Sequence, residues 1–185
     1  MNYQRHSRAS AATVWLTGLP AAGKTALAGA TYRTLAGRQT PACVLDGDVL
    51  RQGLSCDLDL SPAGRAEQGR RAAHVAALVS SAGVTAIVAL VSPYAQDRRR
   101  AREIHERLGV RFVEVWVDTP RKVCEERDPK GLYARCRAGL LHGLTGVDAP
   151  YEAPDDPELR VSAQESTPED LAMLIVELLN SRHPT

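Results

Sequence analysis

Gly18-Leu19-Pro20-Ala21-Ala22-Gly23-Lys24-Thr25 fits the pattern G-x-x-x-x-G-K-[ST], and this stretch decides the fold class. It directly follows the apolar run Thr13–Thr17 and opens the helical stretch Lys24–Ala36. A strand, a glycine-rich loop and a helix in that order form the context in which the pattern binds phosphate. The glycines let backbone N–H groups curl around phosphate oxygens, and the helix N-terminus adds about half a positive charge. The stretch therefore predicts a P-loop that binds a nucleoside triphosphate.

Each polar side chain of this loop has a predicted role. The ammonium of Lys24 is expected to reach the β- and γ-phosphates, and the hydroxyl of Thr25 is expected to ligate Mg²⁺. The loop residues predicted to bind the nucleotide are Gly18, Ala21, Ala22, Gly23, Lys24 and Thr25.

Outside the loop, short β-branched runs alternate with longer helical patterns, which indicates an α/β fold with a parallel sheet. The predicted strands are Thr13–Thr17, Pro41–Asp46, Val84–Val91, Arg111–Val117 and a weaker Glu158–Ser162. The predicted helices are Lys24–Ala36, Ala63–Ser80, Gln96–Leu108 and a last one with Thr167 as N-cap and Pro168 in its first turn. In the second helix, Ala72, Val75, Ala76 and Val79 fall on one face and are expected to be buried. We expect a polar tail over residues 1–12 and a single domain over residues 13–185.

Composition argues against several classes of protein. The 23 Lys and Arg residues nearly balance 22 Asp and Glu, so the net charge of +1 gives no simple case for binding nucleic acid or a membrane. The run Arg98-Arg99-Arg100 is expected to lie on a solvated, ion-paired helix face. There is no apolar run of about 18 residues and no signal-like N-terminus. Four cysteines without C-x-x-C spacing indicate free thiols in a reducing compartment, so we expect a cytoplasmic protein.

One segment, Asp128–Pro157, does not fit the alternating pattern. It is rich in glycine, proline and charge, and loops this long inside a compact domain are usually functional lids or disordered. We expect a lid that is mobile in the absence of ligands.

A carboxylate pair, Asp46-Gly47-Asp48, ends the second predicted strand, whereas the third is followed by Ser92-Pro93-Tyr94. Ligands of open parallel sheets bind beyond the carboxyl ends of the strands, so both carboxylates are expected beside the γ-phosphate. A carboxylate there can accept a proton from an attacking hydroxyl. The alternative is that Asp46 and Asp48 only cap the following helix or hold Arg51.

Taken together, these motifs resemble the adenylylsulfate kinase family over roughly Thr13 to Leu159. Beyond the P-loop and the carboxylate pair, the resemblance is carried by Arg51-Gln52-Gly53-Leu54, Arg65-Ala66-Glu67, Ser92-Pro93-Tyr94, Asp128-Pro129-Lys130-Gly131-Leu132-Tyr133, Thr145-Gly146 and Tyr151-Glu152-Ala153-Pro154. It implies a five-stranded P-loop sheet and a homodimer. The implied reaction is Mg²⁺- and ATP-dependent phosphorylation of the 3′-hydroxyl of adenylylsulfate.

The resemblance also implies roles for single residues. Asp46 would be the base on the acceptor hydroxyl, with Asp48 and Arg51 organising the acceptor nucleotide. Arg65 and Lys130 would hold its phosphosulfate, and Arg127 would lie against the adenine of ATP. Ser92 matches a serine near the transferred phosphate, although a strand-end residue bonding local backbone explains it equally well.

Departures from the family pattern fall on the acceptor side. Two Phe side chains that sandwich adenine in the family are Leu60 and Leu144 here, and an Asn is Gln68; the single Phe of the chain is Phe112. Stacking of an aromatic side chain on a base contributes about 1–3 kcal/mol, and leucine lacks the flat ring that provides it. The acceptor is therefore either adenylylsulfate or another small hydroxyl compound, such as a sugar, nucleoside or amino-acid derivative. A nucleotide-binding regulatory module without phosphotransfer is a further alternative.

Overall fold

The computed structural model describes residues 11–164 and 166–181, and it has a parallel five-stranded sheet at its centre. The strand order is β2-β3-β1-β4-β5, which confirms the predicted α/β class. The strands are β1 (Ala12–Thr17), β2 (Ala42–Asp46), β3 (Thr85–Ala89), β4 (Arg111–Val117) and β5 (Leu159–Val161). All five lie within two residues of their predicted bounds.

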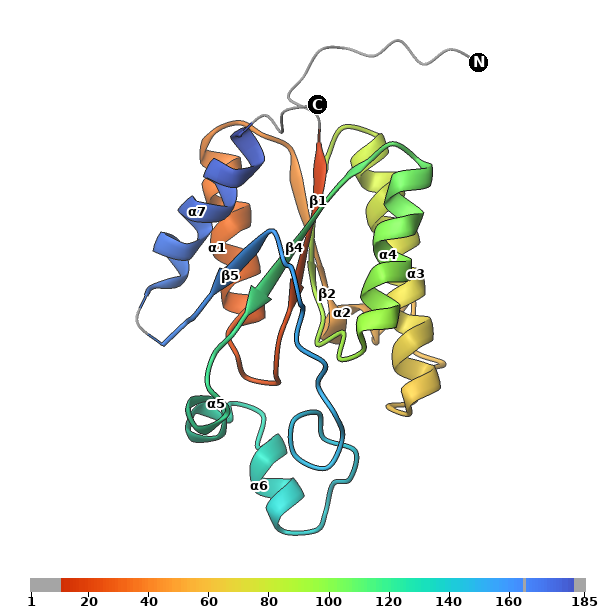
Figure 1. Ribbon diagram of the computed structural model, residues 1–185, viewed down its shortest axis with the longest axis vertical. Helices are drawn as coiled ribbons and strands as arrows, with labels where there is room; N and C mark the ends of the chain where they lie inside the picture. The colour runs from red at the N-terminus through yellow and green to blue at the C-terminus, as the bar shows by residue number, and fades with distance from the viewer. Residues whose placement is uncertain (1–10, 165, 182–185) are drawn as a thin grey trace.

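Helices cover both faces of this sheet (Figure 1). They are α1 (Lys24–Gly37), α2 (Gly47–Leu50), α3 (Pro62–Ser81), α4 (Ala95–Arg107), α5 (Arg121–Arg127), α6 (Leu132–Arg137) and α7 (Pro168–Asn180). α1 packs with α7 on one face, and α3 packs with α4 on the other. The short helices α5 and α6 lie beyond the end of the sheet at which β4 finishes. No helix of the described residues is long and apolar enough to cross a membrane.

The core lies on both faces because side chains alternate along each strand. Val14 and Leu16 of β1 join the core beneath α1 and α7, whereas Trp15 joins the core beneath α3 and α4. The predicted buried stripe of α3 is partly wrong. Val75 and Val79 are half-buried, and the fully buried positions are instead small residues, namely Ala72, Ala73, Ala76 and Ala77.

The arginine run at the start of α4 corrects a second prediction. Arg99 and Arg100 are exposed as expected, but Arg98 is only 3% exposed. Its guanidinium lies 2.7 Å from the carboxylate of Glu114 in β4 and donates a 2.8 Å hydrogen bond to the carbonyl of Ser92. A charge so deeply buried needs a close partner of opposite charge, and the partner comes from the strand beneath the helix.

The remaining differences concern short or terminal segments. Residues 1–10 of the predicted polar tail lie outside the described residues. The predicted end of the tail at residue 12 is wrong, because Ala12 is the first residue of β1 and is buried. The predicted lid, Asp128–Pro157, contains the helix α6, which the sequence did not indicate. Its mobility stays a prediction. Thr167 caps α7 through a capping box with Asp170, as the sequence predicted for the cap residue.

Candidate nucleotide and acceptor site

A cavity of about 1130 Å³ opens at the carboxyl ends of β1, β2 and β3, between the P-loop, α2 and the predicted lid. Most of the predicted site residues line it: Ala21, Gly23, Lys24, Thr25, Asp46, Asp48, Arg51, Leu60, Arg65, Gln68, Ser92, Arg127, Lys130 and Leu144. The strand ends bring them together because each of these strands runs in the same direction.

Backbone geometry fixes the P-loop in its curled form. Gly18 has φ 150°, and a Cβ on it would lie 2.5 Å from the carbonyl oxygen of Val117, so no other residue fits against β4. Ala21 has φ 61°, in the left-handed region that non-glycine residues seldom adopt. Strained backbone of this kind gathers at ligand sites, where it aims N–H groups inward.

Lys24 is folded back over the loop that precedes it. Its ammonium donates hydrogen bonds to the carbonyls of Gly18 at 2.9 Å and Leu19 at 2.7 Å. Burial lowers the pKa of Lys24 to about 8. The nearby Lys130 adds to this lowering, and Cys124, Asp46 and Asp48 act in the opposite direction. The side chain therefore stays mostly protonated at neutral pH and is a compact cation beside the phosphate-binding loop.

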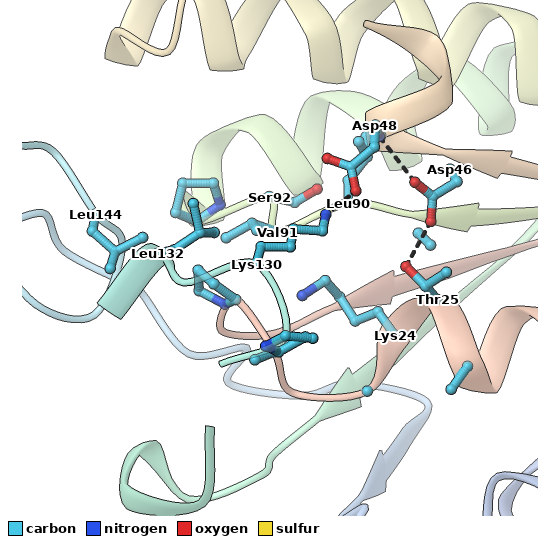
Figure 2. A pocket seen from close by; sticks show the side chains of 18 of the residues that line it. Lys24, Thr25, Asp46, Asp48, Leu90, Val91, Ser92, Lys130, Leu132 and Leu144 are labelled. Carbon is cyan, nitrogen blue, oxygen red and sulfur yellow. Dashed lines mark hydrogen bonds and ion pairs between the residues drawn. The ribbon is translucent and has the colours of Figure 1, made fainter. Parts of the chain in front are cut away.

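Asp46 joins the nucleotide side of the cavity to the acceptor side (Figure 2). Its Oδ2 accepts a 2.7 Å hydrogen bond from the hydroxyl of Thr25, and its Oδ1 accepts a 2.9 Å bond from the backbone N–H of Asp48. It therefore caps α2, as one alternative held, and at the same time lies 9% exposed at the cavity wall. Capping α2 therefore does not prevent Asp46 from acting as a base in the cavity.

Two cations on the acceptor side, Lys130 and Arg51, show that the alternative in which the carboxylates hold Arg51 is wrong. The ammonium of Lys130 forms an ion pair with the carboxylate of Asp48, so Asp48 pairs with the predicted lid and not with Arg51. Arg51 instead donates to the carbonyls of Leu58 at 3.0 Å and Asp59 at 3.1 Å.

Arg65 and Gln68, both on α3, contact backbone carbonyls. The Nε of Arg65 donates to the carbonyl of Leu60 at 2.9 Å, and its Nη2 donates to the carbonyl of Gly143 at 3.1 Å. Gln68 is 6% exposed, and its amide donates at 2.9 Å to the carbonyl of Gly47, between the two carboxylates. Both side chains thus hold loops that form the cavity wall.

The two leucines of the predicted base-binding positions differ in burial. Leu60 is 53% exposed, whereas Leu144 is 5% exposed and packs into the core; both line the cavity. Figure 2 places Leu144 on the opposite side of the view from Asp46. Among the described residues that line the cavity, the only Phe, Tyr or Trp is Trp15. The single Phe of the chain, Phe112, lies in β4 and packs against that indole, with the two ring centroids 5.7 Å apart.

Ser92 follows β3 with φ 43°. Its hydroxyl oxygen accepts a 3.1 Å hydrogen bond from the indole N–H of Trp15, and its carbonyl accepts the bond from Arg98. The local partner of its hydroxyl is thus a side chain of β1 and not the backbone. Its role near a transferred phosphate stays a prediction.

Arg127, predicted to lie against a nucleotide base, lies at the cavity wall and donates to the carbonyl of Ala163. This carbonyl belongs to the segment between β5 and α7, so the guanidinium is held beside the P-loop side of the cavity.

Four residues that sequence reasoning did not assign also belong to the surroundings of the site. Arg135 and His142 of the predicted lid line the cavity. The hydroxyl of Tyr151 lies 3.1 Å from that of Thr17 at the end of β1, and burial raises the pKa of Tyr151 to about 12. The carboxylate of Glu152 accepts a 2.7 Å bond from the N–H of Ala95, at the start of α4. The Tyr-Glu-Ala-Pro motif was the signal available for the last two.

Comparisons with known proteins find relatives that match most of this chain. The family model for adenylylsulphate kinase matches residues 10–162. The bifunctional enzyme CysN/CysC of Mycobacterium tuberculosis H37Rv is 46% identical over 91% of this chain, and the chain spans only 27% of that relative's length. The adenylyl-sulfate kinase of Saccharomyces cerevisiae is 44% identical, with 91% of this chain and 84% of the relative covered.

A solved structure of the M. tuberculosis APS kinase CysC in complex with AMPPNP and APS superposes with a TM-score of 0.90. It is 45% identical, and the match covers 93% of this chain and 99% of that one.

Proposed function

The chain belongs to the adenylylsulfate kinase family, and from that membership we propose that it transfers the γ-phosphate of ATP to the 3′-hydroxyl of adenylylsulfate. The relative solved with AMPPNP and APS supports both substrates. One observation of this chain carries the proposal: the P-loop residue Thr25 and the carboxylate of Asp46 meet at 2.7 Å in the wall of one cavity.

On the nucleotide side, backbone N–H groups of the P-loop and the ammonium of Lys24 bind the phosphates. Lys24 already lies over the loop, bonded to two carbonyls, and phosphate oxygens are stronger acceptors for an ammonium than those neutral carbonyls. The cation offsets the negative charge that spreads over the γ-phosphoryl as it moves, which is the main contribution of protein to this type of transfer.

On the acceptor side, Asp46 takes the proton of the attacking hydroxyl. Its position at the carboxyl end of β2, beside Thr25, supports this role, because an acceptor hydroxyl approaches the γ-phosphate from that end of the sheet. The hydroxyl oxygen then bonds to phosphorus, the bond from phosphorus to the β,γ-bridging oxygen breaks, and ADP leaves with that bridging oxygen.

The residues present fit Mg²⁺. Thr25 donates its proton to Asp46, so the lone pairs of its oxygen are free for a cation, and Asp48 adds a second carboxylate nearby. No group of three His, Cys, Asp or Glu that could hold a metal occurs among residues 11–164 and 166–181. Mg²⁺ does not need one, because it usually takes one or two protein oxygens together with phosphates and water. When bound, the ion neutralises and orients the phosphate oxygens.

Lys130 and Arg65 supply positive charge for the phosphosulfate of the acceptor. The partner of Lys130 is now Asp48, in an exposed pair whose side chains are 55% and 62% exposed. Exposed pairs of this kind contribute at most about 1 kcal/mol, so an anionic acceptor can displace Asp48 from Lys130 at little cost.

The test is a coupled assay with purified protein, ATP, Mg²⁺ and adenylylsulfate, with ADP release and the 3′-phosphorylated product both measured. We expect Asp46→Asn to lower kcat by about 10²–10⁴-fold, the usual contribution of a general base. Asn keeps the oxygen that caps α2, so the fold should be unaffected. Glu106→Gln, an exposed change on α4 outside the cavity and the proposed lid, is the matched control. Turnover of Asp46→Asn within threefold of the parent would rule out the base role.

A second candidate is a kinase of this family with a different acceptor. Leu60 and Leu144 favour it, since among the described residues that line the cavity the only Phe, Tyr or Trp is Trp15, whose 1% exposure leaves almost no ring surface for a base. A panel of nucleosides, sugars and amino-acid derivatives, compared with adenylylsulfate by kcat/KM, separates the two candidates. ATP binding without turnover of any acceptor would instead indicate a regulatory nucleotide-binding module.

Three further parts complete the proposal. The family implies a homodimer, which light scattering can measure. The segment over residues 128–157 is a lid that closes on the substrates, and the protein is cytoplasmic. The four cysteines are free thiols, which fits a reducing compartment.

A further inference from the structure

Two wall segments of the cavity come from distant parts of the chain. One is the loop that leads into α3 and carries Leu60. The other is the turn over residues 143–149 and carries Leu144. We call them the α3 wall and the turn wall. If adenylylsulfate binds as proposed above, its base lies between them, so their separation matters for the acceptor.

The α3 wall is held by its own hydrogen bonds. The carboxylate of Asp59 accepts bonds from the backbone N–H of Ser61 at 3.1 Å and from its hydroxyl at 2.6 Å. The hydroxyl oxygen of Ser61 in turn accepts the N–H of Gly64, in the first turn of α3, at 3.1 Å. This wall is therefore built onto the start of the helix and has a fixed shape.

The turn wall is equally well defined. The carboxylate of Asp148 accepts the backbone N–H groups of Gly143 at 2.8 Å and Leu144 at 2.6 Å. Gly146 has φ 86°, and a Cβ on it would lie 2.5 Å from the side chain of Leu19, so this turn rests directly on the P-loop.

One side chain connects the two walls. The guanidinium of Arg65 donates through Nε to the carbonyl of Leu60 and through Nη2 to the carbonyl of Gly143, at 2.9 and 3.1 Å. A guanidinium is planar and rigid, so two bonds from one fork fix the distance between the two carbonyls. We propose that Arg65 is a positioning residue, whose bridge between the α3 wall and the turn wall sets the width of the acceptor pocket and thereby the acceptor KM.

This role differs from that of an anion ligand, and the difference is measurable. A guanidinium has five N–H groups, and the bridge uses two, so the others remain free for an anionic acceptor. Both bonds of the bridge are made to the protein's own backbone, so it needs no ligand to form. A pure anion ligand would affect the protein only when the acceptor is bound.

The experiment compares Arg65→Lys and Arg65→Met with the parent and with Arg70→Lys. Lysine keeps the charge but lacks the fork, and methionine removes both. Arg70 lies on the same helix, is exposed, and pairs only with Glu67 among the described residues, which makes it the matched control. Thermal unfolding verifies that each variant is folded.

The first measurement is amide hydrogen exchange over residues 141–149 in ligand-free protein. We expect exchange about tenfold faster in both Arg65 variants than in the parent and in Arg70→Lys, because the turn wall loses its link to α3. Unchanged exchange in Arg65→Lys would overturn the proposal, since an anion ligand would leave the free protein as it is. This result does not depend on which acceptor the protein uses.

The second measurement is steady-state kinetics with adenylylsulfate. We expect the acceptor KM of Arg65→Lys to rise about tenfold, with kcat and the KM for ATP within about threefold of the parent. Faster exchange with an unchanged acceptor KM would overturn the claim that the bridge sets acceptor affinity. A parent that does not phosphorylate adenylylsulfate would refute the proposed function, and the exchange data would still decide whether the bridge exists.

Discussion

The carboxylate of Glu152 is the side-chain acceptor at the start of α4. It lies 2.7 Å from the backbone N–H of Ala95, and the N-cap residue of that helix, Tyr94, makes no side-chain cap bond. The first N–H groups of a helix have no partners within it, so an acceptor from elsewhere in the chain stabilises this end. Replacing Glu152 by alanine removes that acceptor and removes a negative charge from the positive end of the helix dipole.

The geometry sets the size of the effect. Loss of an N-cap acceptor costs about 0.5–2 kcal/mol, and a charge at an exposed helix terminus contributes about 0.3–1 kcal/mol. Both estimates describe the same carboxylate, and this bond is exposed, so we expect a loss of about 1–1.5 kcal/mol for Glu152→Ala. For a chain of this size that lowers Tm by about 2–6 °C. Glu152→Gln keeps an oxygen acceptor, so it should lose about half as much.

Thermal melts followed by circular dichroism, with urea unfolding for the free energy, measure these differences. Asp156→Ala removes the same charge four residues along, from an exposed side chain, and should shift the free energy of unfolding by less than about 0.5 kcal/mol. A Tm for Glu152→Ala within 1 °C of the parent would refute the reasoning, taking about 1 °C as the error of such melts. An equal loss in the Asp156 control would show that net charge, and not the helix terminus, is responsible.

Three further predictions concern buried groups. Glu114→Gln leaves Arg98 buried beside a neutral partner, so we expect the free energy of unfolding in urea to fall by about 3 kcal/mol. Adding Arg98→Met should recover part of that loss. If the double variant instead loses the sum of the two single losses, the pairing is contradicted. Burial lowers the pKa of His105, so below about pH 7 the unfolded chain binds a proton that the folded protein does not. The contribution of His105 to the free energy of unfolding should therefore be constant above about pH 7 and fall as the pH drops through about 6.5, and pH-dependent urea unfolding should show a smaller slope in this range for His105→Gln. Gly18→Ala places a Cβ 2.5 Å from the carbonyl oxygen of Val117, which should displace the P-loop. We expect nucleotide binding, measured by calorimetry, to weaken at least tenfold, or about 1.4 kcal/mol. An affinity equal to that of the parent would show that the P-loop can relax around the added Cβ.

The sequence predicted the features that depend on neighbours along the chain. The P-loop, the five strands and the four long helices follow from local spacing, and so does the placement of Asp46 at a strand end. The helix α2 has four residues, too few for a helical period to show. Arg98 was predicted to be a surface charge because its helix is rich in charged residues. Only the fold shows that Glu114 of β4 lies close enough to form an ion pair with Arg98 and so to stabilise its buried charge.

The bridge made by Arg65 could not be read from the sequence for a different reason. Its partners are backbone carbonyls, and one of them is 78 residues away. Sequence patterns identify side chains by type, but every residue has a carbonyl, so a pattern cannot say which one a guanidinium will reach. The resemblance to the family assigned Arg65 to an anion for the same reason: charge is visible in a sequence, and a backbone acceptor is not.

The contact between Gly146 and Leu19 joins the walls of the two proposed substrate sites. The turn over residues 143–149 rests on the P-loop, with the side chain of Leu19 directly against Gly146. Any change in that contact on filling one site must alter the affinity of the other, and linkage requires the factor to be the same in both directions. A larger or smaller side chain at residue 19 would change this packing, and it should therefore change both affinities by one common factor.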